Sequence, residues 1–274
     1  MNRLESLEPI DIARREEERQ ARGTAEIANE SEPFADGTMS FLEVGSWANQ
    51  ACAVGLHGPV TEDAIDRFVD FYVSRGVEPR IEVATFADPT LVDGLARRGF
   101  TLREFENVLA LDLQSPVEGE AQASPSDLRL EPVDRSDEAA LRRYAELTVR
   151  QFYAGQDPAE HQIEASVRIA RHPRCQGFVA WLDGEAVGGG TLEIDGDICS
   201  LIGAAVVPEY RRRGIQTAIM LHRLELARQA GCRLAVIHSK PGIATERNAA
   251  RLGFRLTYVK VAMAMAGEGL VPSP

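Results

Sequence analysis

The sequence lacks most features that mark membrane, secreted or nucleic-acid-binding proteins. None of its apolar runs approaches the roughly 20 residues that a membrane-spanning helix needs, and its N-terminus is rich in Glu and Arg, unlike a signal peptide. Basic residues are also in short supply, since 30 Lys and Arg stand against 42 Asp and Glu, for a formal net charge of −12. Because nucleic acids are bound by basic faces, we expect neither nucleic acid nor a membrane as the main partner.

Cysteine and histidine are scarce and scattered. The four cysteines have neither metal-ligand nor disulfide spacing, and the five histidines form no ligand pattern. Cys199 and Cys232 lie in apolar runs, which predicts reduced core residues rather than nucleophiles. The sequence therefore predicts no metal and a reducing, cytoplasmic setting. The remaining composition, 44% hydrophobic and 26% charged, is that of a globular chain long enough for two domains.

A stretch poor in apolar residues divides the chain into halves of similar size. Residues 114–127 (QSPVEGEAQASPSD) consist mostly of Pro, Ser, Gly and acids, which is typical of a linker. We therefore predict a first domain over 1–113, a second over 128–266 and a tail over 267–274. The first domain should begin with an exposed, charge-rich helix within residues 1–22.

The second half alternates strand-like and helix-like patterns in the order β-α-α-β-β-β-α-β-α-β. This order predicts an α/β fold of the mixed-sheet (α+β) kind. The run Cys232 to His238 is continuously apolar, as expected for a buried central strand, and Phe254 to Met265 should close the sheet of this half. The other expected strands are 128–132, 177–182, 186–194 and 198–207, and the expected helices are 138–153, 158–171, 217–230 and 245–252.

Three consecutive arginines and a glycine, Arg211 to Gly214, separate the strand over 198–207 from the helix over 217–230. Backbone N–H groups at a helix start are unpaired donors with partial positive charge, and a glycine lets that backbone approach a phosphate closely. Arginine side chains add bidentate phosphate contacts. The loop therefore indicates a pyrophosphate site, with a solvated basic turn as the alternative. A P-loop is excluded, because no Gly-x-x-x-x-Gly-Lys-Ser/Thr occurs.

The loop resembles the acyl-CoA loop of the GNAT (GCN5-related N-acetyltransferase) superfamily. That pattern is Gln or Arg, two residues, Gly, one residue, then Gly or Ala, and Arg211, Gly214 and Gln216 stand in those places. Gln216 departs from the pattern, so its side chain must turn away from the ligand. The element order over residues 128–266 also resembles the family's fold. The resemblance implies an acyl-CoA N-acyltransferase fold, acetyl-CoA as acyl donor, and an amine of a small molecule or peptide as acceptor.

The resemblance also implies which residues bind acetyl-CoA and which react. His238, where the second of two splayed strands ends, and Glu193, on a neighbouring strand, are the candidate general bases, and each also has a purely structural explanation. The tyrosine that protonates the leaving thiolate in many relatives is replaced by Ala249, so Tyr258 is the nearest substitute for this catalytic acid. The residues implied to bind the cofactor are Ala205, Val206, Val207, Arg211, Arg212, Arg213, Gly214, Ile215, Gln216, Thr217 and Asn248.

An internal repeat links the two halves. Leu95 to Leu102 (LARRGFTL) recurs as Ala249 to Leu256 (AARLGFRL), and Arg80 to Val83 parallels Arg233 to Val236. The first half lacks the arginine loop and instead reads Leu56 to Asp63 (LHGPVTED), whose acids would repel a pyrophosphate. We therefore predict a tandem GNAT-like protein with a degenerate N-terminal unit. An N-acetyltransferase and a non-catalytic CoA-binding or scaffolding module are both open, as is a homodimer.

Overall fold

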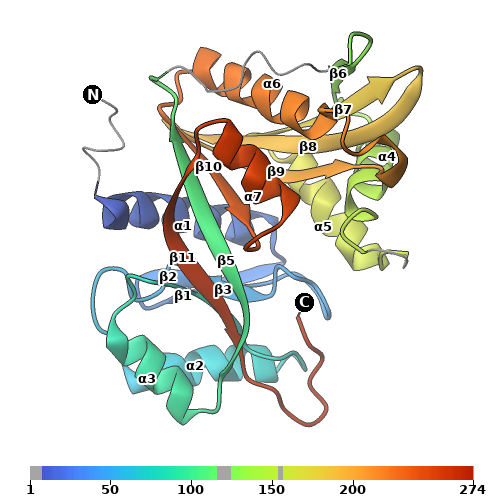
Figure 1. Ribbon diagram of the computed structural model, residues 1–274. Helices are drawn as coiled ribbons and strands as arrows, with labels where there is room; N and C mark the ends of the chain where they lie inside the picture. The colour runs from blue at the N-terminus through green and yellow to red at the C-terminus, as the bar shows by residue number, and fades with distance from the viewer. Residues whose placement is uncertain (1–7, 116–124, 154–156, 274) are drawn as a thin grey trace. The chain divides into compact units, whose positions relative to one another are not determined.

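The structure is a computed structural model that describes residues 8–115, 125–153 and 157–273. The chain folds into two compact units (Figure 1). The C-terminal unit contains residues 109–255, and the N-terminal unit contains residues 7–108 together with 256–274. Most of the predicted linker 114–127 lies outside the described residues, as do residues 1–7 of the predicted first domain and the last residue of the predicted tail.

The C-terminal unit is built on a mixed sheet with the strand order β5-β10-β9-β8-β7-β6. β9 and β10 are parallel, whereas β8 is antiparallel to both β7 and β9. The sequence predicted each strand from β6 to β10. The strands are the end of β5 (Thr101–Asp112), β6 (Arg129–Pro132), β7 (Cys175–Leu182), β8 (Glu185–Asp195), β9 (Ile198–Val206) and β10 (Leu234–Ser239).

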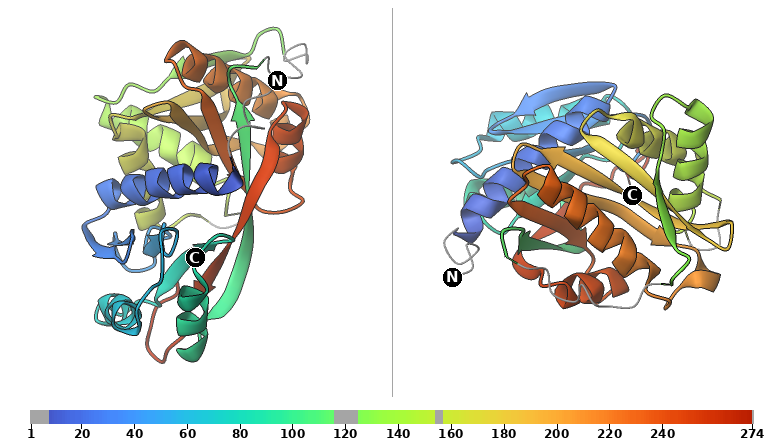
Figure 2. Two further views of the ribbon diagram at one scale, coloured as in Figure 1. Left: turned by 90° about the vertical axis from the view of Figure 1, so that its left-hand side faces the viewer. Right: turned by 90° about the horizontal axis from the view of Figure 1, so that it is seen from above.

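Helices cover the two faces of this sheet. α4 (Glu138–Val149) and α5 (Glu160–Arg171) lie on one face, and α6 (Ile215–Gln229) lies on the other, along the strands in the view from above (Figure 2). Neighbouring glycines of β8 show the two faces: a Cβ on Gly189 would meet Tyr144 of α4, whereas a Cβ on Gly190 would meet Arg223 of α6. The short helix α7 (Ala244–Arg251) follows β10.

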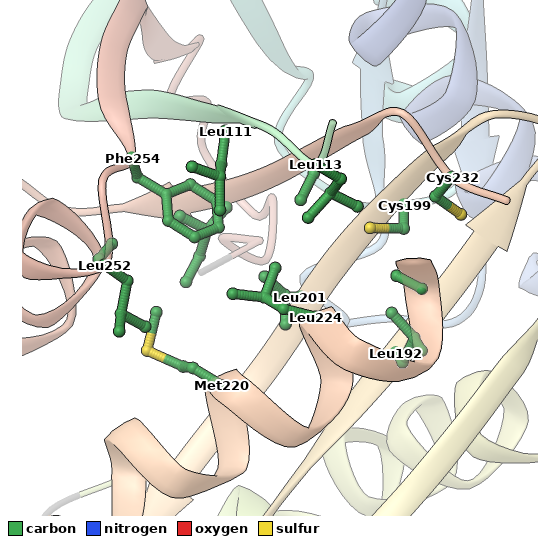
Figure 3. Packing of buried hydrophobic residues seen from close by; sticks show 14 of the residues in the cluster. Leu111, Leu113, Leu192, Cys199, Leu201, Met220, Leu224, Cys232, Leu252 and Phe254 are labelled. Atoms are coloured by element: carbon green, nitrogen blue, oxygen red, sulfur yellow. The ribbon is translucent and has the colours of Figure 1, made fainter. Parts of the chain in front are cut away.

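The largest core cluster of the C-terminal unit joins α6 and α7 to the strands. Met220 and Leu224 of α6 pack with Leu201 of β9 and with Leu252 and Phe254, which follow α7 (Figure 3). Cys199 and Cys232 are buried members of the same cluster, as predicted. Packing of these apolar side chains fixes α6 and α7 relative to the ends of β9 and β10, where the arginine loop lies.

The N-terminal unit has the strand order β1-β2-β3-β4-β11-β5. Its apolar core is rich in aromatic rings, with Phe34 stacked on Phe68 at 4.8 Å between centroids and Tyr72 edge-on to Phe68. Thr61 and Asp88 cap two of its helices by accepting backbone N–H groups. The elements are α1 (Pro9–Ile27), β1 (Glu30–Phe34), β2 (Gly37–Phe41), β3 (Gln50–Cys52), α2 (Glu62–Val73), β4 (Arg80–Ala84), α3 (Pro89–Arg97), β5 and β11 (Arg255–Ala264).

The repeated sequence segments have the same local structure in both units. Each ends a helix, passes through a glycine with positive φ (Gly99 at 78° and Gly253 at 92°) and begins a strand. In both turns the phenylalanine N–H bonds back across the glycine at 3.1 Å, from Phe100 to the Leu95 carbonyl and from Phe254 to that of Ala249. The repeat is therefore structural as well as sequential.

The expectation that 254–265 closes the sheet of its own half is wrong. β11 instead pairs antiparallel with β4, with Lys260 opposite Ala84 and Ala264 opposite Arg80. Conversely, the residues of β5 from Leu109 onward belong to the C-terminal unit, and the Leu113 N–H, just beyond β5, donates to the Arg233 carbonyl at 3.0 Å. Each unit thus contains a strand from the other half of the chain. An alternating strand pattern identifies a strand but not its partner, which is why the sequence missed the exchange.

The expected N-terminal helix is present as α1, but it is exposed on one side only. Glu16 and Glu17 are fully buried and Arg19 is nearly so, because α1 packs against β2 and β3 of its own unit. Arg19 bonds both carboxylate oxygens of Glu16 within the helix, at 2.8 and 2.6 Å. The prediction failed because it treated every charged side chain as solvated, whereas paired charges can be buried.

Candidate functional site

A bulge in β9 opens the sheet of the C-terminal unit. Gly189 lies opposite Ala205 and Thr191 opposite Ile202, so one residue of β8 faces two residues of β9, Gly203 and Ala204. Gly203 has a φ of 59°, the left-handed region that favours glycine in such bulges. A bulge of this kind bends its strand and increases its twist. The end of β9 is thereby bent, while Ala205 and Val206 stay paired with Gly189 and Gly188 of β8.

β10 separates from β9 at the same level of the sheet. The parallel ladder between them has three residue pairs, the last joining Val236 to Ser200. Beyond these pairs β9 continues to Val206 and β10 to Ser239 without further pairing between the two strands. Separated parallel strands leave backbone N–H and C=O groups facing the opening, where an extended ligand can pair with them.

The arginine loop begins where β9 ends. A single 3-10 turn, Pro208–Tyr210, leads into Arg211, Arg212 and Arg213, all three of which are exposed. The chain then reverses into α6 through two residues with positive φ, Arg212 at 64° and Gly214 at 79°. Gly214 is the N-cap of α6 and no side chain caps this helix, so its first N–H groups remain available as donors. Unpaired donors beside exposed guanidinium groups suit a small polyanion.

The three arginines have different surroundings. Nε of Arg211 donates to the Val206 carbonyl at 2.9 Å, which ties the loop to the end of β9. The guanidinium of Arg213 lies over the Tyr210 ring, 5.2 Å from its centroid. Arg212, in the left-handed conformation, is the exposed residue between them. Arg211 thus shapes the loop, and Arg212 and Arg213 offer charge to a ligand.

Of the predicted backbone contacts, two groups already have partners in the protein. The Val207 N–H donates to the Val187 carbonyl at 2.9 Å, so this amide points toward β8. The Val206 carbonyl accepts Arg211, so it points away from β8. Ala205 lies opposite Gly189 of β8. Since backbone groups alternate in direction along a strand, Val206 is the residue of these three whose backbone faces the opening.

Gln216 and Asn248, both predicted to be near the cofactor, bond to each other. Nδ2 of Asn248 donates to Oε1 of Gln216 at 2.7 Å, and Nε2 of Gln216 donates to Oγ1 of Thr245 at 3.1 Å. The Gln216 side chain is thus directed toward α7. Sequence analysis did not single out Thr245.

The two candidate bases of the C-terminal unit lie on the same face of its sheet. Glu193 is opposite Ser200, which is opposite Val236, and His238 is two residues farther along β10. His238 is half-buried and lies on the part of β10 that has separated from β9. Two strand spacings separate β8 from β10, and His238 lies two residues beyond the level of Glu193, so the two side chains start from positions about 12 Å apart.

Glu193 is buried rather than solvent-facing. It is 3% exposed, and its Oε1 lies 3.2 Å from Nη2 of Arg174 in an ion pair. Glu193 is therefore paired with a neighbouring arginine and lies near the end of the β9–β10 ladder. Its role as a base stays a prediction.

Tyr258, the third candidate, lies in the N-terminal unit. Its hydroxyl donates to Oε1 of Glu17 at 2.7 Å and its side chain is buried. Burial and the neighbouring carboxylate of Glu17 raise the pKa of Tyr258 well above its ordinary value. The hydroxyl is therefore protonated at neutral pH and engaged with Glu17. Its role as a catalytic acid also stays a prediction. Ala249, where relatives have a tyrosine, is fully buried in the core of the C-terminal unit.

Arg223 is a buried cation of the C-terminal unit that sequence reasoning missed. Its Nη1 donates to the carbonyls of Thr191 at 2.7 Å and Ile202 at 3.1 Å, bridging β8 and β9 beside the bulge. Gly190 leaves the room for it, since a Cβ there would lie 3.0 Å from Nη1. Burial lowers the pKa of Arg223 to about 10, so it is charged at neutral pH. The sequence signal that could have revealed it is an arginine at helical spacing from the buried apolar residues of α6.

The C-terminal unit is similar to a known family. The family model described as Acetyltransferase (GNAT) family matches residues 141–254, a range that includes the bulge, the separated strands and the arginine loop. This match covers 114 of the 274 residues of the chain. No curated protein matches the chain significantly.

Three solved structures, two of them described as GNAT proteins, resemble most of the chain in fold. A GCN5-related N-acetyltransferase from Kribbella flavida is 17% identical with a TM-score of 0.70, covering 94% of this chain and 97% of that one. A functionally unknown conserved protein from Staphylococcus epidermidis ATCC 12228 is 13% identical with a TM-score of 0.60, covering 86% and 93%. A tandem GNAT protein from the clavulanic acid biosynthesis pathway is 15% identical with a TM-score of 0.59, covering 84% and 78%. The GNAT fold predicted from the sequence is confirmed.

Within the described residues, no group of three His, Cys, Asp or Glu side chains is arranged to hold a metal ion. None of the helices in the described part of the chain is long and apolar enough to cross a membrane.

Proposed function

We propose that the C-terminal unit transfers an acetyl group from acetyl-CoA directly to an amine of a small molecule or peptide. The observation that carries this proposal is the opening between β9 and β10, whose ladder stops at Val236 and Ser200 and which leads to the uncapped start of α6. An extended arm can lie in the opening while a pyrophosphate meets the donors of α6. A generic phosphate site would need only the second of these features.

The residues of the unit suit the binding of acetyl-CoA. The N–H groups of Ile215, Gln216 and Thr217 begin α6 and are directed at the position of the pyrophosphate. Arg212 and Arg213 supply positive charge in a protein that is otherwise acidic. The carbonyl of Val206 accepts Arg211, so the N–H of Val206 is the backbone group at the opening that can pair with a carbonyl of a pantetheine arm.

His238 is the proposed general base of the transfer. It removes a proton from the acceptor ammonium, after which the neutral amine attacks the thioester carbonyl and the C–S bond breaks. An imidazole titrates near neutral pH, and His238 is half-buried on the separated end of β10. Glu193 is the second candidate for this role. A thiolate leaves readily, so the transfer does not require an acid at the sulfur. The net charge of −12 favours cationic acceptors.

Calorimetry with CoA tests the binding half of the proposal. The double substitution Arg212→Glu and Arg213→Glu should weaken CoA binding at least a hundredfold, since it replaces two cations at a polyanion site with two anions. The matched control is Arg143→Glu with Arg150→Glu, two exposed arginines of α4 and its C-cap, which gives the same change in net charge. Absence of CoA binding by the unsubstituted protein, or equal loss in both variants, would contradict the proposal.

A thiol-release assay over a panel of amines tests the chemical half. Turnover should fall at least tenfold in His238→Ala, and the acidic limb of the pH–rate profile should change if His238 is the base. The burial of Ala249 at the family's tyrosine position favours a second candidate, a CoA-binding module without catalysis. CoA binding without thiol release on any amine would support that module and reject the transferase.

A further inference from the structure

Gln216 uses both ends of its carboxamide to join two helices. Oε1 accepts Nδ2 of Asn248 at 2.7 Å, and Nε2 donates to Oγ1 of Thr245 at 3.1 Å. Oδ1 of Asn248 in turn accepts Nη1 of Arg251 at 3.0 Å. Gln216, Thr245 and Asn248 are all half-buried. We call the two bonds of Gln216 the α6–α7 bridge.

The α6–α7 bridge lies at the open end of the space between β9 and β10. The two strands are parallel and paired at their first residues, so they separate toward their carboxyl ends. α6 follows the carboxyl end of β9 through the arginine loop, and α7 follows that of β10. Carboxyl ends of parallel strands meet at one edge of a sheet. The bridge therefore connects the helices that flank the opening at the edge where it is widest.

A ligand that occupies both parts of the site would lie next to the bridge. Its pyrophosphate would meet the first turn of α6, where Gln216 is the second helical residue, and its arm would run into the opening. The side chain of Gln216 leaves that same turn and reaches across to α7. A small side chain at this position would form no such connection, because it could not reach Thr245 or Asn248.

We propose that Gln216 determines the affinity of this site for acyl-CoA, because its bridge to α7 closes the opening and must break when the ligand enters. The inference rests on the proposed function for the identity of the ligand. When the ligand binds, contacts with solvent or ligand replace the two neutral hydrogen bonds of the bridge. The loss of these two bonds lowers the affinity for the ligand. Asn248, released from Gln216, then becomes available to the ligand.

Calorimetry with CoA itself tests the inference. Gln216→Ala removes both bonds and should bind CoA about tenfold more tightly than the unsubstituted protein. Thr245→Val keeps the shape of the side chain, removes one bond and should tighten binding about threefold. The double variant should bind no more tightly than Gln216→Ala alone, because both changes act on the same bridge. Gln229→Ala, at the other end of α6 and bonded to Glu225, is the control and should bind as the unsubstituted protein does.

The outcomes separate this inference from the proposed function. Equal or weaker CoA binding by a folded Gln216→Ala, with binding by the unsubstituted protein intact, overturns the bridge and leaves the CoA site standing. Failure of all variants to bind CoA overturns the proposed function and the bridge together. Thermal unfolding without CoA verifies that each variant is folded, and loss of the bridge should lower the melting temperature slightly.

Discussion

Lys260 is the most deeply buried cation of the N-terminal unit. Its Nζ lies 2.6 Å from Oε2 of Glu82 and 3.5 Å from Oε1 of Glu17 and Oε2 of Glu106, and the side chain is 1% exposed. Burial alone would lower the pKa of Lys260, but the three carboxylates together raise it well above its ordinary value. Burial alone would raise the pKa of Glu82. Its cationic neighbours, chiefly Lys260, instead keep the pKa of Glu82 below the ordinary value of 4.5. The network therefore depends on one ammonium.

Replacing Lys260 by Met should lower the free energy of unfolding by about 3–5 kcal/mol at pH 7, because it leaves carboxylates buried without their main cation. The pH dependence should also change sign. In the unsubstituted protein the folded-state pKa of Glu82 is depressed, so its contribution is present above about pH 4.5 and is lost as the pH falls. Without Lys260, burial raises that pKa, so the variant should gain stability as the pH falls from 7 toward 5.

Urea unfolding of both proteins between pH 4 and 8 measures this difference. The gap between the two stability curves should narrow on acidification. Arg67→Met, an exposed position on α2, removes the same charge from the surface of the same unit and should change stability by less than about 0.5 kcal/mol. Parallel curves for the Lys260 variant and the unsubstituted protein would show that the carboxylates do not depend on this cation.

At the scale of elements, the bulge of β9 sets the opening at the candidate site. Gly203 has a φ of 59°, and a Cβ on it would meet no atom within 4 Å, so only the backbone conformation resists substitution. Gly203→Ala should cost about 1–2 kcal/mol in the present conformation. A shift to regular pairing avoids that strain. We therefore expect CoA binding to weaken at least tenfold as β9 realigns.

Gly184→Ala is the matched control for this prediction. Gly184, in the turn between β7 and β8, has a φ of 84° and equally open surroundings. Its substitution should cost similar stability and leave CoA binding unchanged, as measured by calorimetry at a temperature where both variants are folded. Equal effects of the two substitutions on CoA binding would mean that the bulge does not shape the site.

Sequence patterns identified the elements of this protein better than their pairing. The strand β10 is a continuous apolar run, and the arginine loop lies between a strand and a helix, so the element order could be predicted. The bond between Tyr258 and Glu17 joins residues 241 positions apart, and no local pattern encodes it. The same is true of the ladder that ends at Val236 and Ser200, because the end of a pairing depends on both strands at once.

At the scale of the whole molecule, the exchange of terminal strands makes the two halves of the chain depend on each other. β11 supplies Lys260 and Tyr258 to the buried network of the N-terminal unit, and its ladder with β4 runs from Lys260 to Ala264. Leu109 and Leu111 of β5, and Leu113 just beyond it, belong to the core cluster of the C-terminal unit. Neither half of the sequence therefore contains a complete unit.

We predict that cutting the chain within residues 114–127 leaves the two fragments associated. Separation would expose the apolar residues of β5 and would uncover Glu17 and Glu82 without Lys260, which is costly in both units.

A protease site inserted in this segment permits cleavage of the folded protein. The cleaved protein should elute from gel filtration as the intact one does and should separate only in denaturant. Each fragment expressed alone should be unfolded or insoluble, whereas co-expression should restore the complex. Two fragments that elute separately and remain folded would contradict the exchange, because each unit would then have been completed by its own half of the chain.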